Sequence, residues 1–126
     1  MTSRTYTYDS LKECVLDFIR DLQESVFYAN NTEIDDMLKI KLLFERMHPE
    51  MVYKHIGEKL LPYKTKITSR DMNYFKENYA SLFEKLDSQK ADYYAKQLTD
   101  SSRIDDNDRN AIWGHLNTII KVYNAI

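Results

Sequence analysis

Apolar residues recur at every third or fourth position along most of this chain, the spacing that puts them on one face of an α-helix. The first run, in residues 10–28, is Leu11, Val15, Phe18, Ile19, Leu22 and Val26. The second, after Asn30–Asn31, is Ile34, Met37, Leu38, Leu42, Phe44 and Met47. The chain has two glycines and two prolines, which disfavours a hairpin-rich β fold. The pattern therefore predicts an all-α fold, a compact single-domain array or bundle of five to seven short amphipathic helices.

Capping patterns set the expected helix starts. Three pairs of residues have the spacing of a capping box: Ser10 with Glu13, Thr32 with Asp35, and Thr68 with Asp71. Asp105 and Asp108 place negative charge at a further helix start, where the helix dipole favours it. A third helix is expected to begin at Pro49 and to end at Pro62, followed by a connector over residues 63–67. Later helices are expected over residues 72–86 (one long helix or two short ones), from about residue 88, and after Asp105. Residues 1–9 are predicted to be a flexible or partner-bound tail, and residues 10–126 the helical domain.

The sequence offers few side chains for catalysis or metal binding. A phosphate-binding loop needs several glycines close together, whereas Gly57 and Gly114 are far apart. Glu45 and His48 form one E-x-x-H pair, and the second pair that a di-iron bundle needs is missing. Cys14 is the single cysteine and has apolar neighbours at helical spacing, which favours a packing role. We therefore predict no enzyme activity, no catalytic residues, no metal, no cofactor and no small-molecule substrate.

Acidic and basic residues are separated along the chain. Residues 9–36 contain eight acids and two bases, whereas residues 52–70 contain five bases and one acid. The opposite charges could pair within the fold or between subunits, the basic segment could follow a phosphate backbone, or the charges could form a solvated surface. The pI of about 5.9 disfavours a dedicated nucleic-acid-binding domain. The candidate contacts to a partner or to a phosphate backbone are Lys54, Lys59, Lys64, Lys66 and Arg70.

Two adjacent pairs of acids, Asp35–Asp36 and Asp105–Asp106, are the remaining candidates for acid–base chemistry. Both pairs fall at predicted helix starts, where capping and the helix dipole favour negative charge. We therefore interpret both pairs as helix-start residues.

Aromatic residues are abundant, with ten tyrosines, five phenylalanines and one tryptophan. Tyrosine combines apolar area with a polar tip, which suits half-buried positions and protein interfaces. Trp113 is expected in the core, and the adjacent Gly114 would permit close approach of another backbone. The candidate interface aromatics are Tyr6, Tyr8, Tyr63 and Tyr93.

Targeting signals are missing from the sequence. No apolar run approaches the ~18 residues that would span a bilayer, and the N-terminus has no apolar signal-peptide core. A single cysteine also suits a reducing compartment. The sequence predicts a cytoplasmic protein without membrane contact.

Three stretches carry a resemblance. They are Phe18-Ile-Arg-Asp-Leu22; Pro49-Glu-Met-Val-Tyr53, continued by Leu61-Pro-Tyr-Lys64, Ile67 and Arg70-Asp-Met-Asn-Tyr-Phe75; and Asp105-Asp-Asn-Asp-Arg-Asn-Ala-Ile-Trp-Gly-His-Leu116. In these the chain resembles small uncharacterised proteins encoded by the large nucleocytoplasmic DNA viruses of algae and amoebae. The resemblance implies a helical protein that acts in the cytoplasm of an infected cell or in a virion. It implies no catalytic residues.

The leading functional prediction is a non-enzymatic protein–protein interaction module, viral in origin, that binds a protein partner or itself. The alternative is a nucleic-acid-associated accessory protein that uses the basic segment 52–70. A third hypothesis is that the protein is a minor structural, capsid-associated component.

Overall fold

The chain folds into helices arranged in two layers, and the computed structural model describes residues 6–71, 88–99 and 102–126. Every regular element in these ranges is helical, which confirms the all-α prediction. None of the described helices is both long and apolar enough to cross a membrane. In chain order the elements are α1 (Tyr8–Ser25), α2 (Asn31–Arg46), α3 (Pro49–Lys59), the 3-10 helix η1 (Leu61–Tyr63), α4 (Lys64–Thr68), α6 (Ser88–Thr99) and α7 (Asp106–Ala125).

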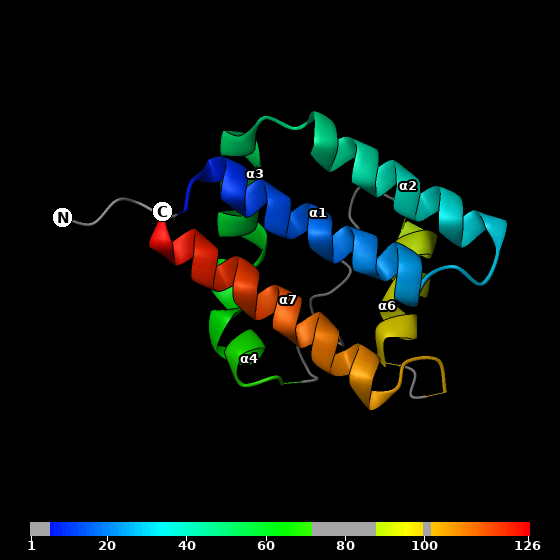
Figure 1. The fold of residues 1–126 in the computed structure, drawn as a ribbon. Coiled ribbons are helices and arrows are strands. Elements are labelled where there is room, and N and C mark those ends of the chain that lie inside the picture. The colour runs from blue at the N-terminus through cyan, green and yellow to red at the C-terminus, as the bar shows by residue number, and fades with distance from the viewer. Residues whose placement is uncertain (1–5, 72–87, 100–101) are drawn as a thin grey trace.

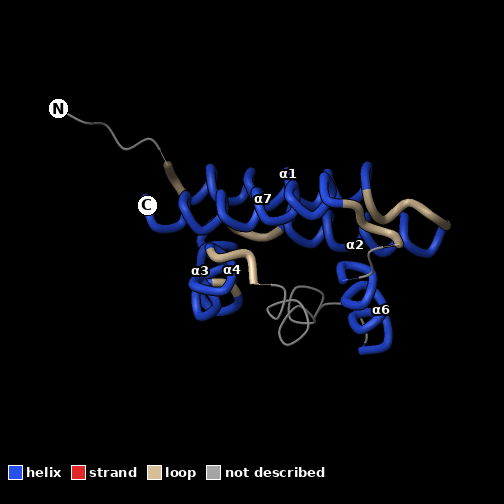
Figure 2. The backbone as a smooth tube through the Cα atoms, turned by 90° about the horizontal axis from the view of Figure 1, so that it is seen from below, coloured by secondary structure: helices blue, strands red, loops and turns tan. Residues whose placement is uncertain are grey.

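The first layer consists of α2, α1 and α7, with α1 in the middle (Figure 1). Both outer helices run antiparallel to α1. The second layer covers one side of the first: α3 and α4 lie under one end, and α6 lies under the other end (Figure 2). The inner faces of both layers therefore enclose the core between them.

The core is built from the apolar faces that the residue spacing predicts. On α1, five residues of the predicted run are buried, and Val26 directly after the helix is buried as well. Trp113 on α7 is almost fully buried, as expected for a core tryptophan. Burial of a large apolar side chain stabilises the fold by about 1.5–3 kcal/mol. The core contacts of α1 with both neighbours thus fix the first layer.

Two helix starts differ from the predicted ones. Thr7 caps α1, with Ser10 as its reciprocal partner, so the helix begins at Tyr8 and not at Ser10. Asn30 caps α2 by accepting a hydrogen bond from the amide of Glu33, so the predicted Thr32–Asp35 pair lies inside the first turns. In each case an earlier residue with a side-chain oxygen satisfies the free amides. The predicted helix start at Asp105 is confirmed, and the structure shows that Asp105 and Asp108 form a capping box there.

The region around α3 agrees with prediction at its start and differs at its end. Pro49 occupies the first turn, and His48 caps the helix with Nδ1, which accepts from the amide of Glu50 at 3.2 Å. The helix ends at Lys59, before Pro62, which lies inside η1. The predicted connector 63–67 is mostly helical, because α4 begins at Lys64. The helix predicted over residues 72–86 lies outside the described residues.

The surroundings of Gly114 differ from those expected. A Cβ added at Gly114 would have no neighbour within 4 Å, so this position is not a point of close approach. A Cβ at Gly57 would lie 2.7 Å from the hydroxyl oxygen of Tyr123. The close contact at a glycine is therefore between α3 and α7.

Candidate functional site

Two carboxylates on the inner face of α2 are buried. Glu33 and Asp36 are each 1% exposed, and three residues of spacing put them on the same side of the helix. Asp36 was expected to be a helix-start residue, and it lies in the second turn of α2. Its buried carboxylate has hydrogen-bond donors on α6, as a buried charge requires.

Glu33 is bound by donors from three parts of the chain. Arg103 approaches it with both terminal nitrogens, Nη2 at 2.5 Å from Oε1 and Nη1 at 3.0 Å from Oε2. The amide of Ala29 donates to Oε1 at 3.2 Å, and the hydroxyl of Tyr93 donates to Oε2. Burial by itself would raise the pKa of Glu33, but the hydrogen bonds from Arg103, Tyr93 and Ala29 outweigh it and lower the pKa. The ionised form of Glu33 is therefore favoured.

Arg103 connects this carboxylate to the α1–α2 loop. Its Nη2 donates to the carbonyl oxygen of Val26 at 2.6 Å, and its guanidinium lies over the ring of Phe27, 5.6 Å from the centroid. The hydrogen bond to Glu33 is the main reason that the pKa of Arg103 is raised. One guanidinium thus joins the loop before α2, the first turn of α2 and the segment before α7.

Asp36 is bound by two residues of α6. The hydroxyl of Tyr94 donates to Oδ2 at 2.7 Å, and Nζ of Lys90 lies 2.8 Å from Oδ1. Burial raises the pKa of Tyr94 strongly, and the hydrogen bond to Asp36 raises it further. Tyr94 is therefore a permanent donor to Asp36 in neutral solution.

A polar pocket of about 350 Å³ lies beside these groups, between α2 and α6. It is lined by Asn30, Thr32, Glu33, Asp36, Gln89, Lys90, Tyr93 and Tyr94. General acid–base catalysis requires a group that titrates near the working pH, whereas the pKa of Glu33 is lowered and that of Tyr94 is raised. The hydrogen bonds of Glu33 and Asp36 instead hold α2 against α6 and against the segment before α7.

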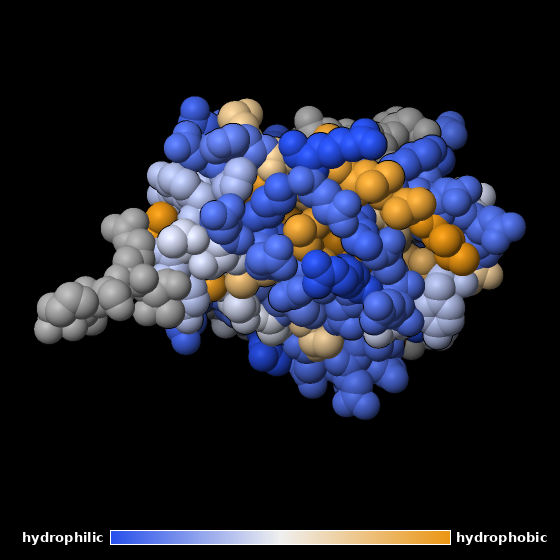
Figure 3. Space-filling model, turned by 45° about the horizontal axis from the view of Figure 1, so that its top comes forward, coloured by the Kyte–Doolittle hydropathy of each residue, from blue (hydrophilic) through white to orange (hydrophobic). Residues whose placement is uncertain are grey.

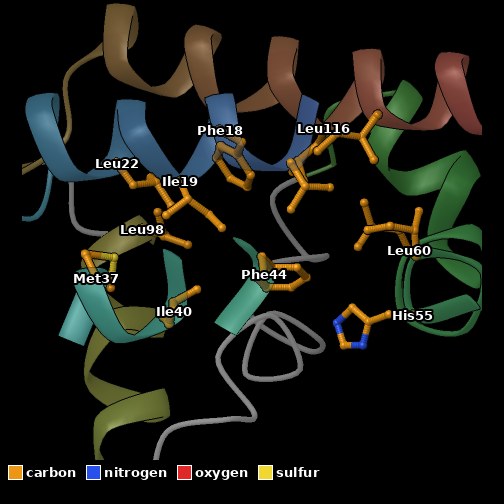
Figure 4. Close-up of a pocket in the computed structure, with 13 residues that line it drawn as sticks. Phe18, Ile19, Leu22, Met37, Ile40, Phe44, His55, Leu60, Leu98 and Leu116 are labelled. Carbon is orange, nitrogen blue, oxygen red and sulfur yellow. The ribbon is translucent and has the colours of Figure 1, made fainter. Parts of the chain in front are cut away.

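A second, smaller cavity of about 60 Å³ extends the core between the two layers (Figure 4). Its lining is apolar apart from His55, whose ring makes an edge contact with Phe44 at 5.6 Å. The lining residues come from both layers: Val15, Phe18, Ile19, Leu22, Met37, Ile40, Phe44, His55, Ile56, Leu60, Leu98, Leu116 and Ile119. One imidazole at the edge of an apolar space is too little to orient a polar ligand.

The outer face of α2 carries the most distinctive surface feature. Ile34, Leu38 and Leu42 are 46%, 43% and 37% exposed, and their spacing of four residues sets them in one row. We call these three residues the α2 stripe. Figure 3 shows an apolar band on this side of the molecule, running among polar surroundings. The sequence indicated one apolar face for this helix, but α2 has two: Met37, Ile40 and Phe44 form the buried one.

The five predicted basic contacts lie on α3, on α4 and in the turn after α4. Lys54, Lys64 and Arg70 are exposed, whereas Lys59 and Lys66 are half-buried. Arg70 donates a hydrogen bond to Oδ1 of Asn110 at 3.1 Å, which ties the turn after α4 to α7.

The predicted interface aromatics make contacts within the fold. Tyr6 and Tyr63 are half-buried against the core. Tyr8 is partly exposed and contacts the ring of Tyr53, with centroids 5.0 Å apart. Tyr93 is also partly exposed, and its hydroxyl is bound to Glu33. The α2 stripe could not be singled out from the residue pattern, because exposure of a helix face depends on what packs against it.

Comparisons with protein-family models, with curated proteins and with solved structures find no match. The resemblance to proteins of large DNA viruses therefore stays a prediction.

Proposed function

We propose that this protein is a non-enzymatic protein-interaction module whose binding surface is the α2 stripe. The observation that carries the proposal is the row of three large aliphatic side chains on the solvent side of a helix. Single exposed apolar residues are common on protein surfaces, whereas a continuous group of them marks an interaction site. A helical row at a spacing of four residues fits a partner helix that packs along it.

The other face of α2 supports this proposal. Three apolar residues hold the helix to the core: Met37, Ile40 and Phe44. Glu33 binds the segment before α7, and Asp36 binds α6. The stripe is therefore presented on a helix that is already fixed in place. Binding then costs little ordering of the backbone, which favours affinity.

We also propose the setting that the sequence resemblance implies, the cytoplasm of an infected cell or a virion. A minor structural role in a virion would use the same surface. The alternative, nucleic-acid association through residues 52–70, is supported by the exposed Lys54 and Lys64 on neighbouring helices. It predicts salt-sensitive binding to RNA or DNA that is lost when the five basic residues become alanine.

Site-specific photocrosslinking in the cells that make the protein tests the proposal. A benzophenone amino acid replaces Leu38 in one variant and Met51 in a control, because Met51 is a 53% exposed apolar residue on α3. We expect protein adducts from position 38 and none from position 51. Adding Ile34→Lys should lower the adduct yield at least about tenfold, since burial of isoleucine contributes about 1.5–3 kcal/mol. Equal adducts from both positions, or none from position 38, would contradict the proposal.

A further inference from the structure

We propose that the polar pocket between α2 and α6 binds a neutral sugar of monosaccharide size. Its volume of about 350 Å³ lies at the lower end of the range of about 300–1,000 Å³ that small-molecule sites have in proteins. The pocket faces α6, whereas the α2 stripe faces solvent, so this inference is independent of the proposed function. The sequence did not indicate this pocket, because its lining residues come from two segments that are far apart in the chain.

The charged groups at the pocket are paired with each other. Nη2 of Arg103 lies 2.5 Å from Oε1 of Glu33. Nζ of Lys90 lies 2.8 Å from Oδ1 of Asp36. An anionic ligand would have to take a cation from a buried carboxylate, and a cationic ligand would have to replace that cation, and breaking a buried ion pair is costly. These four charges therefore favour a ligand that carries no charge.

The hydrogen-bonding groups that remain available in the pocket are neutral. Among the residues that the structure describes, Thr32 and Gln89 form no side-chain hydrogen bond, and Asn30 uses only Oδ1, to cap α2. An amide has both a donor and an acceptor, and a hydroxyl can act as either. The hydroxyl groups of a sugar have the same dual character and can pair with all three side chains. An apolar ligand would bury them without partners.

Tyr93 adds an aromatic ring that is held in place beside these polar groups. The side chain is 40% exposed, its hydroxyl donates to Glu33, and its ring makes an edge contact with Tyr94, with centroids 5.1 Å apart. A ring that is already fixed loses little side-chain freedom when a ligand binds. The C–H face of a sugar ring is apolar and packs on an aromatic ring, while its hydroxyl groups point outward to hydrogen-bond partners. The pocket offers both kinds of contact together.

An NMR titration of the full-length chain labelled with nitrogen-15 tests the proposal. The probes are D-glucose, D-galactose, D-mannose and N-acetyl-D-glucosamine. We expect at least one of them to shift the backbone amide signals of Thr32, Gln89 and Tyr93, with a Kd on the order of 1 mM. The amide signal of Met51 on α3 should stay in place. The proposal is wrong if none of these sugars moves the pocket signals, or if the shifts occur only elsewhere.

Two variants test the hydrogen bonds from the pocket. Thr32→Val and Gln89→Ala should each raise the Kd about three- to tenfold, because each removes one hydrogen bond of ordinary strength. The matched controls are Thr118→Val on α7 and Gln23→Ala on α1, which should bind like the parent. Thermal unfolding checks that every variant is folded. An unchanged Kd in both pocket variants would show that the sugar binds without these side chains and would overturn the assignment.

A charged sugar tests the ligand class. D-glucuronate differs from D-glucose by a carboxylate, and it should bind no more tightly than D-glucose, because the cations at the pocket already have partners. The Kd of the neutral sugar should not change with salt concentration, since salt screens interactions between charges. Tighter binding of glucuronate, or a Kd for the neutral sugar that rises with salt, would contradict a neutral ligand. None of these outcomes alters the proposal for the α2 stripe, which photocrosslinking tests separately.

Discussion

Glu33 and Arg103 are 70 residues apart in the sequence and form a two-point ion pair, with Nη2 of Arg103 2.5 Å from Oε1 of Glu33. The pair joins the first turn of α2 to the segment before α7. Because the carboxylate is 1% exposed, its charge depends on Arg103, Tyr93 and the amide of Ala29 for compensation. The pair therefore fixes the helix that carries the α2 stripe.

Replacing Arg103 with alanine should lower the free energy of unfolding by about 3–5 kcal/mol, since it leaves a buried carboxylate without its charged partner. Arg103→Lys should lose less, because an ammonium keeps the charge but lacks the two-point geometry. Urea denaturation measures both. The matched control is Arg20→Ala, which removes an exposed ion pair with Asp17. It should cost less than about 1 kcal/mol, and an equal loss at both positions would contradict the argument.

The stability that Glu33 contributes should depend on pH. Its pKa in the folded chain is below the ordinary value of 4.5, so as the pH falls the unfolded chain takes up the proton first. The contribution is complete above about pH 4.5 and is lost as the pH falls through the lower folded value. Denaturation of the parent and of Glu33→Gln across the acid range should show their difference in unfolding free energy shrinking as the pH falls. A constant difference would mean that the Glu33 pKa is not lowered.

Helix starts could be predicted from the sequence where residues close together in the chain determine them. Pro49 at the start of α3 and the acids at the start of α7 were predicted because the first turn of a helix tolerates proline and favours negative charge. The start of α1 was missed by two residues, since Thr7 with Ser10 competes with the more familiar spacing of Ser10 with Glu13. Several residues can cap the same turn, and tertiary contacts choose among them.

The candidate site was not predictable in the same way. The burial of Asp36 depends on Tyr94 and Lys90, more than 50 residues further along the chain. A spacing of four residues is also ambiguous, because it describes the core face of α2 and the exposed α2 stripe equally well. Which of the two faces is covered depends on the position of α1 and α6, and that is a property of the whole fold.

Cys14 should react slowly with alkylating reagents. Burial raises the pKa of its thiol, and the nearby Asp17 and Glu13 raise it further, so little of the reactive thiolate forms near neutral pH. Iodoacetamide labelling followed by mass spectrometry should be several-fold slower for the native chain than for the chain in denaturant. A thiol at Leu38→Cys in the Cys14→Ser parent provides the exposed comparison, and it should react faster than Cys14. Equal rates at both positions would show that the thiol is not protected.

The two helical glycines should respond in opposite directions to alanine. Gly114→Ala should raise the free energy of unfolding by about 0.5–1 kcal/mol, because alanine is the better helix former and its Cβ meets nothing within 4 Å. Gly57→Ala should lower it by about 1 kcal/mol. Its Cβ would lie 2.7 Å from the hydroxyl oxygen of Tyr123, whose ring stacks on Tyr53 at 4.3 Å and has to leave that stack.

A second variant separates this steric effect from a general intolerance of α3 to substitution. Tyr123→Phe removes the hydroxyl oxygen, and the nearest remaining ring atom would lie 3.4 Å from the new Cβ, an ordinary contact. Gly57→Ala should therefore be better tolerated in the Tyr123→Phe chain than in the parent, by about 1 kcal/mol in thermal or urea unfolding. If the cost of Gly57→Ala is the same with and without the hydroxyl, the contact between Gly57 and Tyr123 does not limit the packing of α3 on α7.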